Sequence, residues 1–495
     1  MLSWVSANPK KVFALLGACL ALGQAPLSLW ALAFAALIAA QYIWLVAPDT
    51  RRFWTVWWFG FGYFLISMNW LVEPFLVDIK RHGFMAPFAV GAMASGLAFI
   101  WAFPVWIIRA SPFLLAFAVG LGEFARGFLF TGFPWGQIAY IWVDTPIALW
   151  AAFIGSYGLS AVTVLMALAI AWALRAPRRL IFAPLLAVIS FGPSLIYRPM
   201  VETSDQIVRV IQPNAIQSQK WDPEHSMTFF QRSLDYTGRS GDVDLIVWPE
   251  SSVPVFLNYA DDLMQDIVSF AQGRPVLVGA LRFEDYDYYN SVVMVDEEGS
   301  YEPVYDKQHL VPFGEYLPFN AFFQSLGLSA LADMVGGGFT PGETKDFAQV
   351  PNIGSIKPLI CYEAVFPQDV QSHGDRPNLL VQMTNDAWFG NFSGPYQHLV
   401  QTQMRAIEQG LPLVRAANTG VSAVIDPLGE IIQIIPLNQQ GYMDVALPKP
   451  IEATVYSQFG DRFVIILLSI LGVLCFIKPQ GVLGLTQRAQ SPKRR

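Results

Sequence analysis

Charged residues are scarce in this chain of 495 residues: they make up 14% of the sequence, whereas an ordinary soluble protein carries about 25%. The formal net charge is −7 and no basic patch interleaved with aromatic residues is visible, which argues against a partner nucleic acid. No spacing of histidine, cysteine and carboxylate residues is typical of a metal site, and we expect neither a metal nor a cofactor. What the chain has in excess is apolar sequence, at 54%.

The apolar residues are unevenly distributed and predict three parts. Residues 1–198 are almost continuously apolar, residues 199–460 have the composition of a globular domain, and residues 461–495 hold one more apolar run and a basic tail. We therefore expect an N-terminal membrane domain, an extramembrane domain and a C-terminal transmembrane helix.

A helix needs roughly 20 apolar residues to cross a bilayer, and about eight segments of the chain are predicted to do so. A cleavable signal peptide is a competing interpretation of the N-terminus, but another apolar segment follows at once and no small-residue cleavage site is evident. The predicted spans are residues 11–24, 27–46, 53–72, 84–107, 112–131, 146–173, 179–197 and 462–477.

The orientation of these spans follows from the lysine and arginine residues of the loops, which accumulate on the cytoplasmic side. With the N-terminus inside, the short outer loops contribute little beyond Lys80 and Arg81, and the large domain falls outside the cytoplasm. The predicted cytoplasmic loops hold Lys10, Lys11, Arg51, Arg52, Arg109, Arg175, Arg178 and Arg179.

Cysteine is rare, with three residues in the chain, and no disulfide framework is indicated. Cys19 and Cys475 lie inside apolar runs, which leaves Cys361 as an isolated thiol in the outer domain. It is either a buried core residue or a residue kept for its chemistry, and composition alone leaves both interpretations open.

From about residue 206 the pattern changes to short β-branched runs separated by helical patterns. Helices are predicted at Asp261–Gln272 and Gln397–Gln409, and the alternation is typical of a mixed α/β layered fold. The predicted strands include Ile207–Ile211, Asp244–Trp248, Pro275–Gly279, Asn290–Val295, Leu359–Cys361, Leu379–Met383, Leu413–Ala416 and Val421–Ile425.

Ionisable or nucleophilic residues lie in or beside three of these segments, where a rigid sheet can hold the loops, and the residues on them, in fixed positions. "LIVWPES" places Glu250 after a strand, "YDKQHLVPFGEYLPF" places Lys307 and Glu315 in an irregular loop, and "LICYEAVFP" places Cys361 between a strand and a helix. Each residue alone has an ordinary explanation, because most such glutamates and lysines are solvated surface charges. Together they offer a nucleophile, a carboxylate and a cation to one pocket.

The chemical roles of these three residue types are complementary. A free thiol has a pKa of about 8.5 and needs help to ionise near neutral pH. A poorly solvated carboxylate can take the thiol proton, and an ammonium can stabilise the oxyanion of a tetrahedral intermediate together with backbone N–H groups. His309, in the same loop motif, is interpreted as structural.

The motifs "WPES", "YDKQHLVPFGEYLP" and "LICYE" resemble the Glu-Lys-Cys triad motifs of the nitrilase, or carbon–nitrogen hydrolase, superfamily. Together with the apolar spans, the segments "EFARGFLFTGFPWGQIAY", "QPNAIQSQKWDP" and "TNDAWFG" resemble its membrane-integrated branch, the apolipoprotein N-acyltransferases of bacterial inner membranes. The resemblance covers essentially the whole chain. It implies an αββα sandwich domain beside a multi-span helical membrane domain, with the sandwich on the periplasmic side.

The resemblance also implies a reaction in which an acyl chain passes from a phospholipid, commonly phosphatidylethanolamine, through a thioester to the α-amine of the diacylglyceryl-cysteine of an apolipoprotein. Glu250 would be the general base, Lys307 the oxyanion stabiliser and Cys361 the nucleophile. Positions that support catalysis or substrate binding in the family are matched by Trp221, Glu315, Tyr362 and Glu363.

Two further segments invite a hypothesis. Residues 319–339 are strongly apolar and then glycine-rich, which favours a mobile arm at the membrane surface hinged at Gly336, Gly337 and Gly338, although a core helix with a flexible tail fits the same pattern. Glu123 and Arg126 lie three residues apart in an apolar span, and we expect a structural ion pair rather than a site for a lipid headgroup, because intramembrane charges are costly and usually paired.

Two other classes of protein are weighed against the acyltransferase. A membrane-tethered amidase would use the same triad to hydrolyse a small C–N substrate, but a single anchor would serve it. A transporter or scaffold with a decayed enzyme domain is disfavoured because all three triad positions hold competent residues. Nothing in the sequence asks for more than a monomer.

Overall fold

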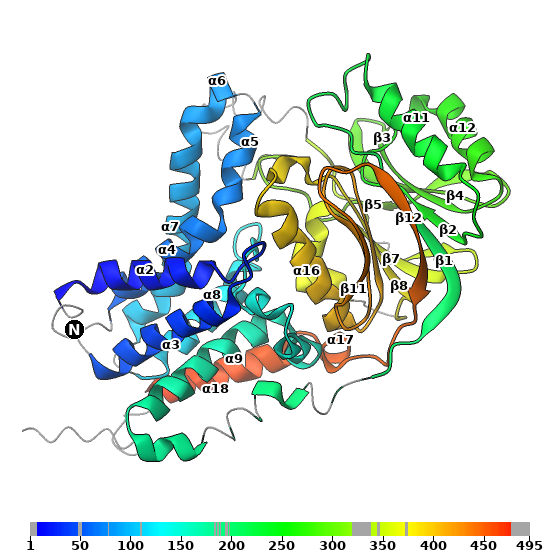
Figure 1. Cartoon of the computed structure of the whole chain (residues 1–495). Coiled ribbons are helices and arrows are strands. Elements are labelled where there is room, and N and C mark those ends of the chain that lie inside the picture. Colours follow the sequence, from blue (N-terminus) through cyan, green and yellow to red (C-terminus); the bar gives the residue numbers. More distant parts are fainter. Residues whose placement is uncertain are drawn as a thin grey trace, which may run out of the picture.

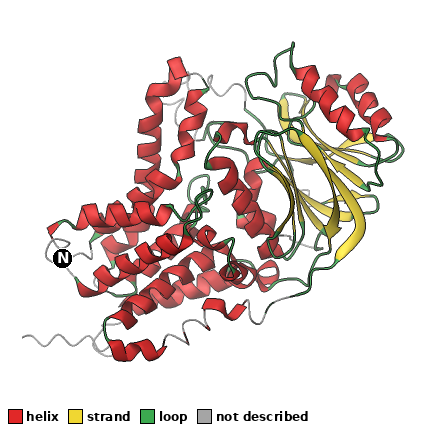
Figure 2. Ribbon diagram, in the orientation of Figure 1, coloured by secondary structure: helices red, strands yellow, loops and turns green. Residues whose placement is uncertain are grey.

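The computed structural model describes residues 7–476, except for 48–51, 78, 109–110, 183–184, 186–187, 189, 194–196, 198, 319–337, 344–346 and 372–374. One half of the molecule is helical and the other half is built around two β-sheets (Figures 1 and 2). The basic C-terminal tail and most of the predicted arm at 319–339 lie outside the described residues.

The helical half contains seven longer helices and several short ones within the described residues. The longer helices are α2 (Pro9–Ala21), α3 (Trp30–Val46), α4 (Phe53–Ser67), α7 (Ala86–Ile107), α8 (Leu114–Arg126), α9 (Ala151–Leu174) and α18 (Arg462–Phe476). The short ones are η2 (Asn69–Val72), α5 (Glu73–Leu76), α6 (Ile79–His82), η3 (Gly83–Met85), η4 (Ile138–Trp142), η5 (Pro146–Trp150) and η6 (Pro177–Phe182).

Two of the described helical stretches, Ile79–Ile107 and Pro146–Leu174, are both long and apolar enough to cross a membrane. The helices Trp30–Val46 and Arg462–Phe476 are apolar but shorter. The predicted span at 179–197 lies partly outside the described residues. The count of eight spans therefore stays a prediction.

The predicted span at 112–131 is too long, because α8 ends at Arg126. The Arg126 guanidinium donates through Nη1 to the carbonyl oxygens of Phe133 and Trp135, at 2.9 and 2.6 Å, so the following loop turns back over the helix end. The expected ion pair is confirmed: Arg126 Nη2 lies 3.1 Å from Glu123 Oε2, and both side chains are fully buried.

The other half is an αββα sandwich, as predicted from the sequence. One sheet has the strand order β12-β1-β2-β3-β4-β5 and the other β11-β10-β9-β8-β7-β6. The first-sheet strands are β1 (Thr203–Gln212), β2 (Leu245–Val247), β3 (Val276–Glu284), β4 (Asp287–Val295), β5 (Tyr301–Asp306) and β12 (Gly441–Pro448). The second-sheet strands are β6 (Ala348–Val350), β7 (Gly354–Ile360), β8 (Leu379–Thr384), β9 (Leu413–Ala417), β10 (Ser422–Ile425) and β11 (Ile431–Ile435).

Apolar side chains from both faces of each sheet hold the four layers together. Val210, Val247 and Met383 belong to the core between the two sheets. Helices α11 (Ser226–Thr237) and α12 (Asp261–Ala271) cover the outer face of the first sheet, and α16 (Gly394–Gln409) lies between the second sheet and the helical half (Figure 1). The short elements η7 (Leu257–Tyr259), η8 (Cys361–Val365), α15 (Pro367–Val370), η9 (Asp386–Phe389) and α17 (Val455–Phe459) complete the domain.

The two halves share one hydrophobic core. The cluster that contains Phe13 of α2 extends without interruption to Tyr362, Phe366 and Met404 of the sandwich domain. Side chains of the sandwich also bind the loop after α8: Tyr362 donates to the Gly132 carbonyl at 3.2 Å, and Trp135 Nε1 donates to Gln397 at 2.7 Å. The helical half is thus packed directly beneath the segment that carries Cys361.

Candidate active site

Three strand ends bring together the residues that the sequence analysis singled out. Glu250 follows β2, Lys307 follows β5, and Cys361 follows β7 and begins η8. β2 and β5 belong to one sheet and β7 to the other, so the site forms where the ends of the two sheets face each other.

The Glu250 carboxylate is fixed by hydrogen bonds to both of its oxygens. Oε1 accepts from Asn290 Nδ2 at 2.7 Å, and Oε2 accepts from the backbone N–H of Asn385 at 2.8 Å. The side chain is nearly buried, which limits its solvation by water. A carboxylate so oriented presents its remaining lone pairs in a fixed direction and can accept a proton there.

The Lys307 ammonium is buried between two carboxylates. Its Nζ lies 2.8 Å from Glu315 Oε1 and 3.9 Å from Glu250 Oε1. Burial favours the neutral amine, but the negative charges of Glu315 and Glu250 outweigh it and hold the pKa of Lys307 above its ordinary value. Lys307 is therefore a permanent positive charge beside Glu250.

Cys361 adopts a left-handed backbone conformation, with φ of 50°, and is 7% exposed. That region costs a residue with a Cβ roughly 1–2 kcal/mol, so the surrounding structure must hold it. Burial, followed by the negative charge of Glu250, raises the pKa of the Cys361 thiol, while Lys307 acts in the opposite direction. The resting thiol is protonated and depends on a nearby base to become a nucleophile.

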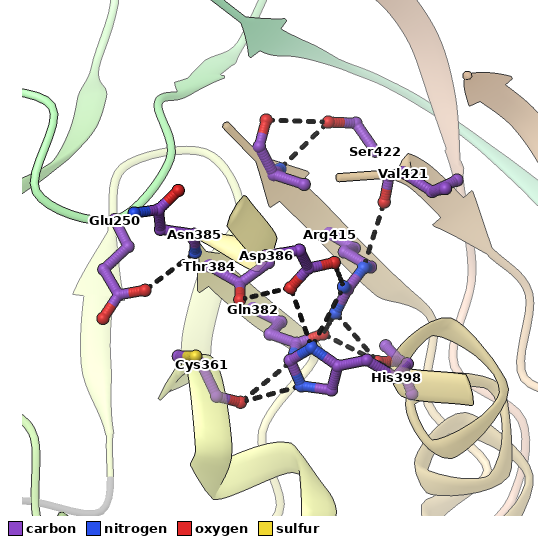
Figure 3. Close-up of polar contacts among 12 residues, drawn as sticks. Glu250, Cys361, Gln382, Thr384, Asn385, Asp386, His398, Arg415, Val421 and Ser422 are labelled. Carbon is purple, nitrogen blue, oxygen red and sulfur yellow. Dashed lines mark hydrogen bonds and ion pairs between the residues drawn. The ribbon is translucent and has the colours of Figure 1, made fainter. Parts of the chain in front are cut away.

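A buried polar network holds the backbone carbonyl of Cys361 (Figure 3). Gln382 Nε2 donates to that carbonyl at 3.1 Å and lies 3.0 Å from His398 Nε2. His398 Nδ1 in turn lies 2.9 Å from Asp386, whose other oxygen accepts from Arg415 at 2.5 Å.

The ionisation states of this network follow from its charges. Burial opposes ionisation of Asp386, but Arg415 and His398 together lower its pKa to about 2. Burial, with Arg415, lowers the pKa of His398, so the imidazole is neutral. His398 Nε2 lies 3.1 Å from the Cys361 carbonyl oxygen and 3.0 Å from Gln382 Nε2, so the imidazole and the Gln382 amide both contact that carbonyl.

The other predicted site residues surround the triad in different ways. Glu315 binds Lys307 and also accepts from the Val311 N–H at 2.7 Å. Tyr362 points toward the loop after α8 instead of toward the triad. Trp221 is 44% exposed and lines a cavity that includes Glu250.

Glu363 links the two loops that carry Lys307 and Cys361. Its Oε1 accepts from the Tyr305 hydroxyl and the Gln308 N–H, both at 2.7 Å, and its Oε2 accepts from the Ile360 N–H at 2.6 Å. Burial raises the pKa of Glu363, whereas these donors favour its charged form. The carboxylate fixes the spacing between the two loops.

Sequence reasoning missed Lys220 and His398. Lys220 is buried beside Glu250, with Nζ donating to the Glu250 backbone carbonyl at 3.1 Å. Lys220 does precede Trp221 in "QKWDP", which is the signal that could have drawn attention to it. His309, interpreted as structural, stacks on Phe366 with ring centroids 3.7 Å apart, and its Nδ1 lies 2.6 Å from Asp369.

Among the described residues, no group of three or more histidine, cysteine, aspartate or glutamate side chains is placed to hold a metal ion. The charges of Glu250 and Lys307 both act on the Cys361 thiol. A cysteine, a carboxylate and a buried ammonium at one site can form and resolve an acyl-enzyme.

The fold and this site define a carbon–nitrogen hydrolase domain, and the family model with the description "Carbon-nitrogen hydrolase" matches residues 207–455. A second family model, "Apolipoprotein N-acyltransferase N-terminal domain", matches residues 16–169. The chain belongs to the apolipoprotein N-acyltransferase family.

Relatives of that name match the chain over most of its length. One from Rhodopseudomonas palustris is 36% identical, with 95% of each chain covered. One from Brucella melitensis is 38% identical, covering 80% of this chain and 79% of the relative. Among solved structures, an amidase from Nesterenkonia sp. is 19% identical with a TM-score of 0.40, covering 54% of this chain and 98% of the amidase.

Proposed function

We propose that this protein transfers an acyl chain from a phospholipid, through a thioester on Cys361, to the α-amine of the N-terminal diacylglyceryl-cysteine of apolipoproteins. This is the final step of lipoprotein maturation. The observation that carries the proposal is the convergence of Glu250, Lys307 and Cys361 in a domain whose core continues into an apolar helical half.

In the first half-reaction Glu250 takes the thiol proton, and the thiolate of Cys361 attacks the ester carbonyl of the donor lipid. Lys307 and backbone N–H groups of η8 stabilise the oxyanion. The tetrahedral intermediate collapses, the carbon–oxygen bond breaks, and the departing lysophospholipid oxygen takes the proton from Glu250. The acyl chain remains on Cys361 as a thioester.

In the second half-reaction the α-amine of the acceptor attacks the thioester carbon. An α-amine has a pKa of about 7.7–8.0, so a useful fraction is neutral near pH 7. Glu250 accepts the proton lost by the attacking nitrogen, the carbon–sulfur bond breaks, and the thiolate of Cys361 is protonated again. An amide forms, and the enzyme returns to its starting state.

The supporting residues have separate tasks in this scheme. Glu315 keeps Lys307 charged and oriented, Glu363 fixes the distance between the Lys307 and Cys361 loops, and Tyr362 anchors the Cys361 turn to the helical half. Trp221, at the rim of the neighbouring cavity, contacts substrate.

The helical half serves a reaction in which both substrates reside in a bilayer. Moving a lipid into water costs about 0.8 kcal/mol per CH₂, and a site packed on membrane helices avoids that cost. We propose about eight spans, a location in the bacterial inner membrane with the sandwich domain on the periplasmic side, phosphatidylethanolamine as donor, and a monomeric enzyme.

Mass spectrometry of the purified protein tests the proposal. After incubation with phosphatidylethanolamine alone, the peptide that contains Cys361 should carry one acyl chain, and a diacylated lipopeptide should remove it with formation of an N-acylated product. Cys361→Ser should show neither change, whereas Cys19→Ser, which alters a thiol of α2, should behave like the unmodified chain.

Two results would contradict this assignment. N-acylation by Cys361→Ser would exclude the thioester route. Release of the acyl chain as free fatty acid at the same rate with and without the lipopeptide would favour an amidase-like hydrolase.

A further inference from the structure

Lys220 is a buried cation that the proposed mechanism does not use. It lies in the turn between β1 and α11 and is 7% exposed. Its Nζ donates to the backbone carbonyl of Glu250 at 3.1 Å and lies 5.6 Å from the centroid of the Trp221 ring. The turn is also tied to the site through Gln217, which accepts from Asn385 Nδ2 at 2.9 Å.

Within the described residues, Lys220 has no carboxylate at ion-pair distance, whereas Lys307 has two. A buried ammonium without a counter-ion is costly, because its desolvation is repaid only by a close negative charge. Burial accordingly lowers the pKa of Lys220 to about 8, although the charges of Glu250 and Cys361 act in the opposite direction. The residue is placed for an anion that the chain itself does not supply.

The Lys220 side chain lines a hollow whose other walls are formed by polar, aromatic and apolar residues. The hollow is bounded by Trp221 and Glu250, by Ser226, Ser252 and Asn418, and by the apolar residues Pro213, Ala215 and Pro254. Glu250 therefore separates two environments: its carboxylate faces Lys307, and its carbonyl faces Lys220.

We infer that Lys220 is the cation of an anion subsite that binds the phosphodiester of the donor lipid while the ester carbonyl of the same lipid meets Cys361. The inference rests on the proposed function, and it deepens it by assigning headgroup chemistry to a residue. Of the two substrates, the donor carries an anion close to its reacting carbonyl, whereas the acceptor carries an amine there. A positive charge at this place would attract the first and repel a protonated form of the second.

Comparison of a charged and a neutral donor tests the subsite. The full-length enzyme is given phosphatidylethanolamine or a diacylglycerol with the same chains, and the rate of thioester formation on Cys361 is measured below saturation. Lys220→Met should lose about 30-fold or more in kcat/KM with the phospholipid, which is the lower end of the effect of truncating one partner of a buried charge pair. With diacylglycerol the variant should stay within about threefold of the unmodified enzyme.

Three further variants sharpen the test. Lys220→Gln keeps a polar N–H donor at this position without a charge, and it should show the same donor-dependent loss. Lys220→Arg keeps the charge and should retain most of the phospholipid activity. Lys449→Met removes an exposed lysine paired with Glu202 and should leave both rates unchanged.

Inorganic phosphate distinguishes the two sources of the anion. Competitive inhibition that disappears in Lys220→Met would support the subsite and show that it accepts phosphate without lipid chains. Absence of inhibition, with the donor-dependent loss retained, would support a site restricted to lipid-borne phosphate.

An equal loss with both donors would overturn the inference, because Lys220 would then act on Glu250 or Cys361 rather than on phosphate. Full activity of Lys220→Met with the phospholipid would overturn it as well. Failure of the proposed function looks different: the unmodified enzyme would form no thioester with either donor.

Discussion

At the scale of single residues, hydrogen bonds from Asn290 and Asn385 orient the Glu250 carboxylate for proton transfer. A glutamine at this position would keep part of these hydrogen bonds. Glu250→Gln can still accept one hydrogen bond, from Asn290 or Asn385, but it cannot take the thiol proton. We expect acyl transfer to fall by about 10²- to 10⁴-fold, the usual contribution of a general base, with little change in thermal unfolding.

Rate measurements across pH check this expectation. Because burial raises the pKa of the Cys361 thiol, the residual rate of Glu250→Gln should keep increasing with pH as hydroxide replaces the base. Glu284→Gln, an exposed glutamate paired with Arg282, is the matched control. A variant rate equal to that of the unmodified enzyme at pH 7 would remove Glu250 from the mechanism.

The residues at the site differ in how far sequence could reveal them. Glu250, Lys307 and Cys361 stand at strand ends, and the structure brings them together; their catalytic roles stay predictions. Lys220 and His398 were missed because adjacent residues do not show whether a lysine or histidine is buried; the one local signal was the position of Lys220 beside Trp221. Their burial results from tertiary packing, to which β1, α11 and α16 all contribute.

At the scale of secondary-structure elements, the network behind η8 keeps Cys361 in its left-handed conformation. His398→Leu would remove the partner of Asp386 and also the ring whose Nε2 lies 3.1 Å from the Cys361 carbonyl oxygen, so that carbonyl would keep Gln382 alone of the two side chains that hold it. Misplacement of a reacting group by about 1 Å can lower a rate on the order of 10²-fold, and we expect thioester formation to fall by about that much.

The loss should appear in kcat rather than in KM, because His398 does not face the donor. The unfolding free energy should also decrease, by about 1–3 kcal/mol, for the buried groups left unpaired. Ser422→Ala removes a buried hydroxyl that binds Gln212 away from Cys361, and it should reduce stability without changing kcat. A change of KM alone in His398→Leu would contradict the positioning role.

The four strands that the sequence analysis did not predict were missed for one physical reason. Every strand predicted from β-branched runs is present, whereas β5, β6, β11 and β12 were not anticipated, and these four are the edges of the two sheets. Edge strands are covered on fewer sides, so fewer of their side chains must be apolar. β11 is largely exposed, and β5 contains Pro303, which is tolerated because an edge strand can leave one backbone position without a hydrogen bond.

At the scale of the whole molecule, a buried ion pair lies where α16 meets α9. Glu408 Oε1 accepts from the Ser156 N–H at 2.7 Å and from Arg405 Nη2 at 3.0 Å. Burial raises the pKa of Glu408 from 4.5 to about 7, although Arg405 acts in the opposite direction.

This shift predicts a pH dependence of stability. The folded chain holds the Glu408 proton more tightly than the unfolded chain does. The bound proton therefore adds to the free energy of unfolding in full below pH 4.5, and this stabilisation is lost as the pH rises to about 7. A shift of this size corresponds to about 3 kcal/mol. Glu408→Gln keeps the acceptor for Ser156 but does not titrate, so its stability should lack that decline.

Unfolding of the two proteins in the same detergent between pH 4.5 and pH 7.5 provides the measurement. The difference between their unfolding free energies should change across this interval, whereas Glu430→Gln, at an exposed position, should give a constant difference. Parallel curves for Glu408→Gln and the unmodified chain would show that Glu408 does not take up a proton on folding.

Composition predicted the division into an apolar and a globular part, but not how the parts meet. Hydropathy alone did not mark where helices end inside the apolar runs, so the predicted span at 112–131 continued past the end of α8 at Arg126. The helix ends there because the Arg126 guanidinium binds the carbonyl oxygens of Phe133 and Trp135 in the following loop. That loop then reaches Tyr362 and Gln397. Such contacts between segments far apart in the sequence cannot be predicted from local hydropathy.

The uninterrupted core from α2 to α16 has a practical consequence. If the sandwich domain were cut free, the side chains of Tyr362, Phe366 and Met404 would be bared to water next to the nucleophile. Such a fragment would aggregate or lose the shape of its reactive turn, so biochemical screening and inhibitor discovery will require the intact chain in detergent or nanodiscs.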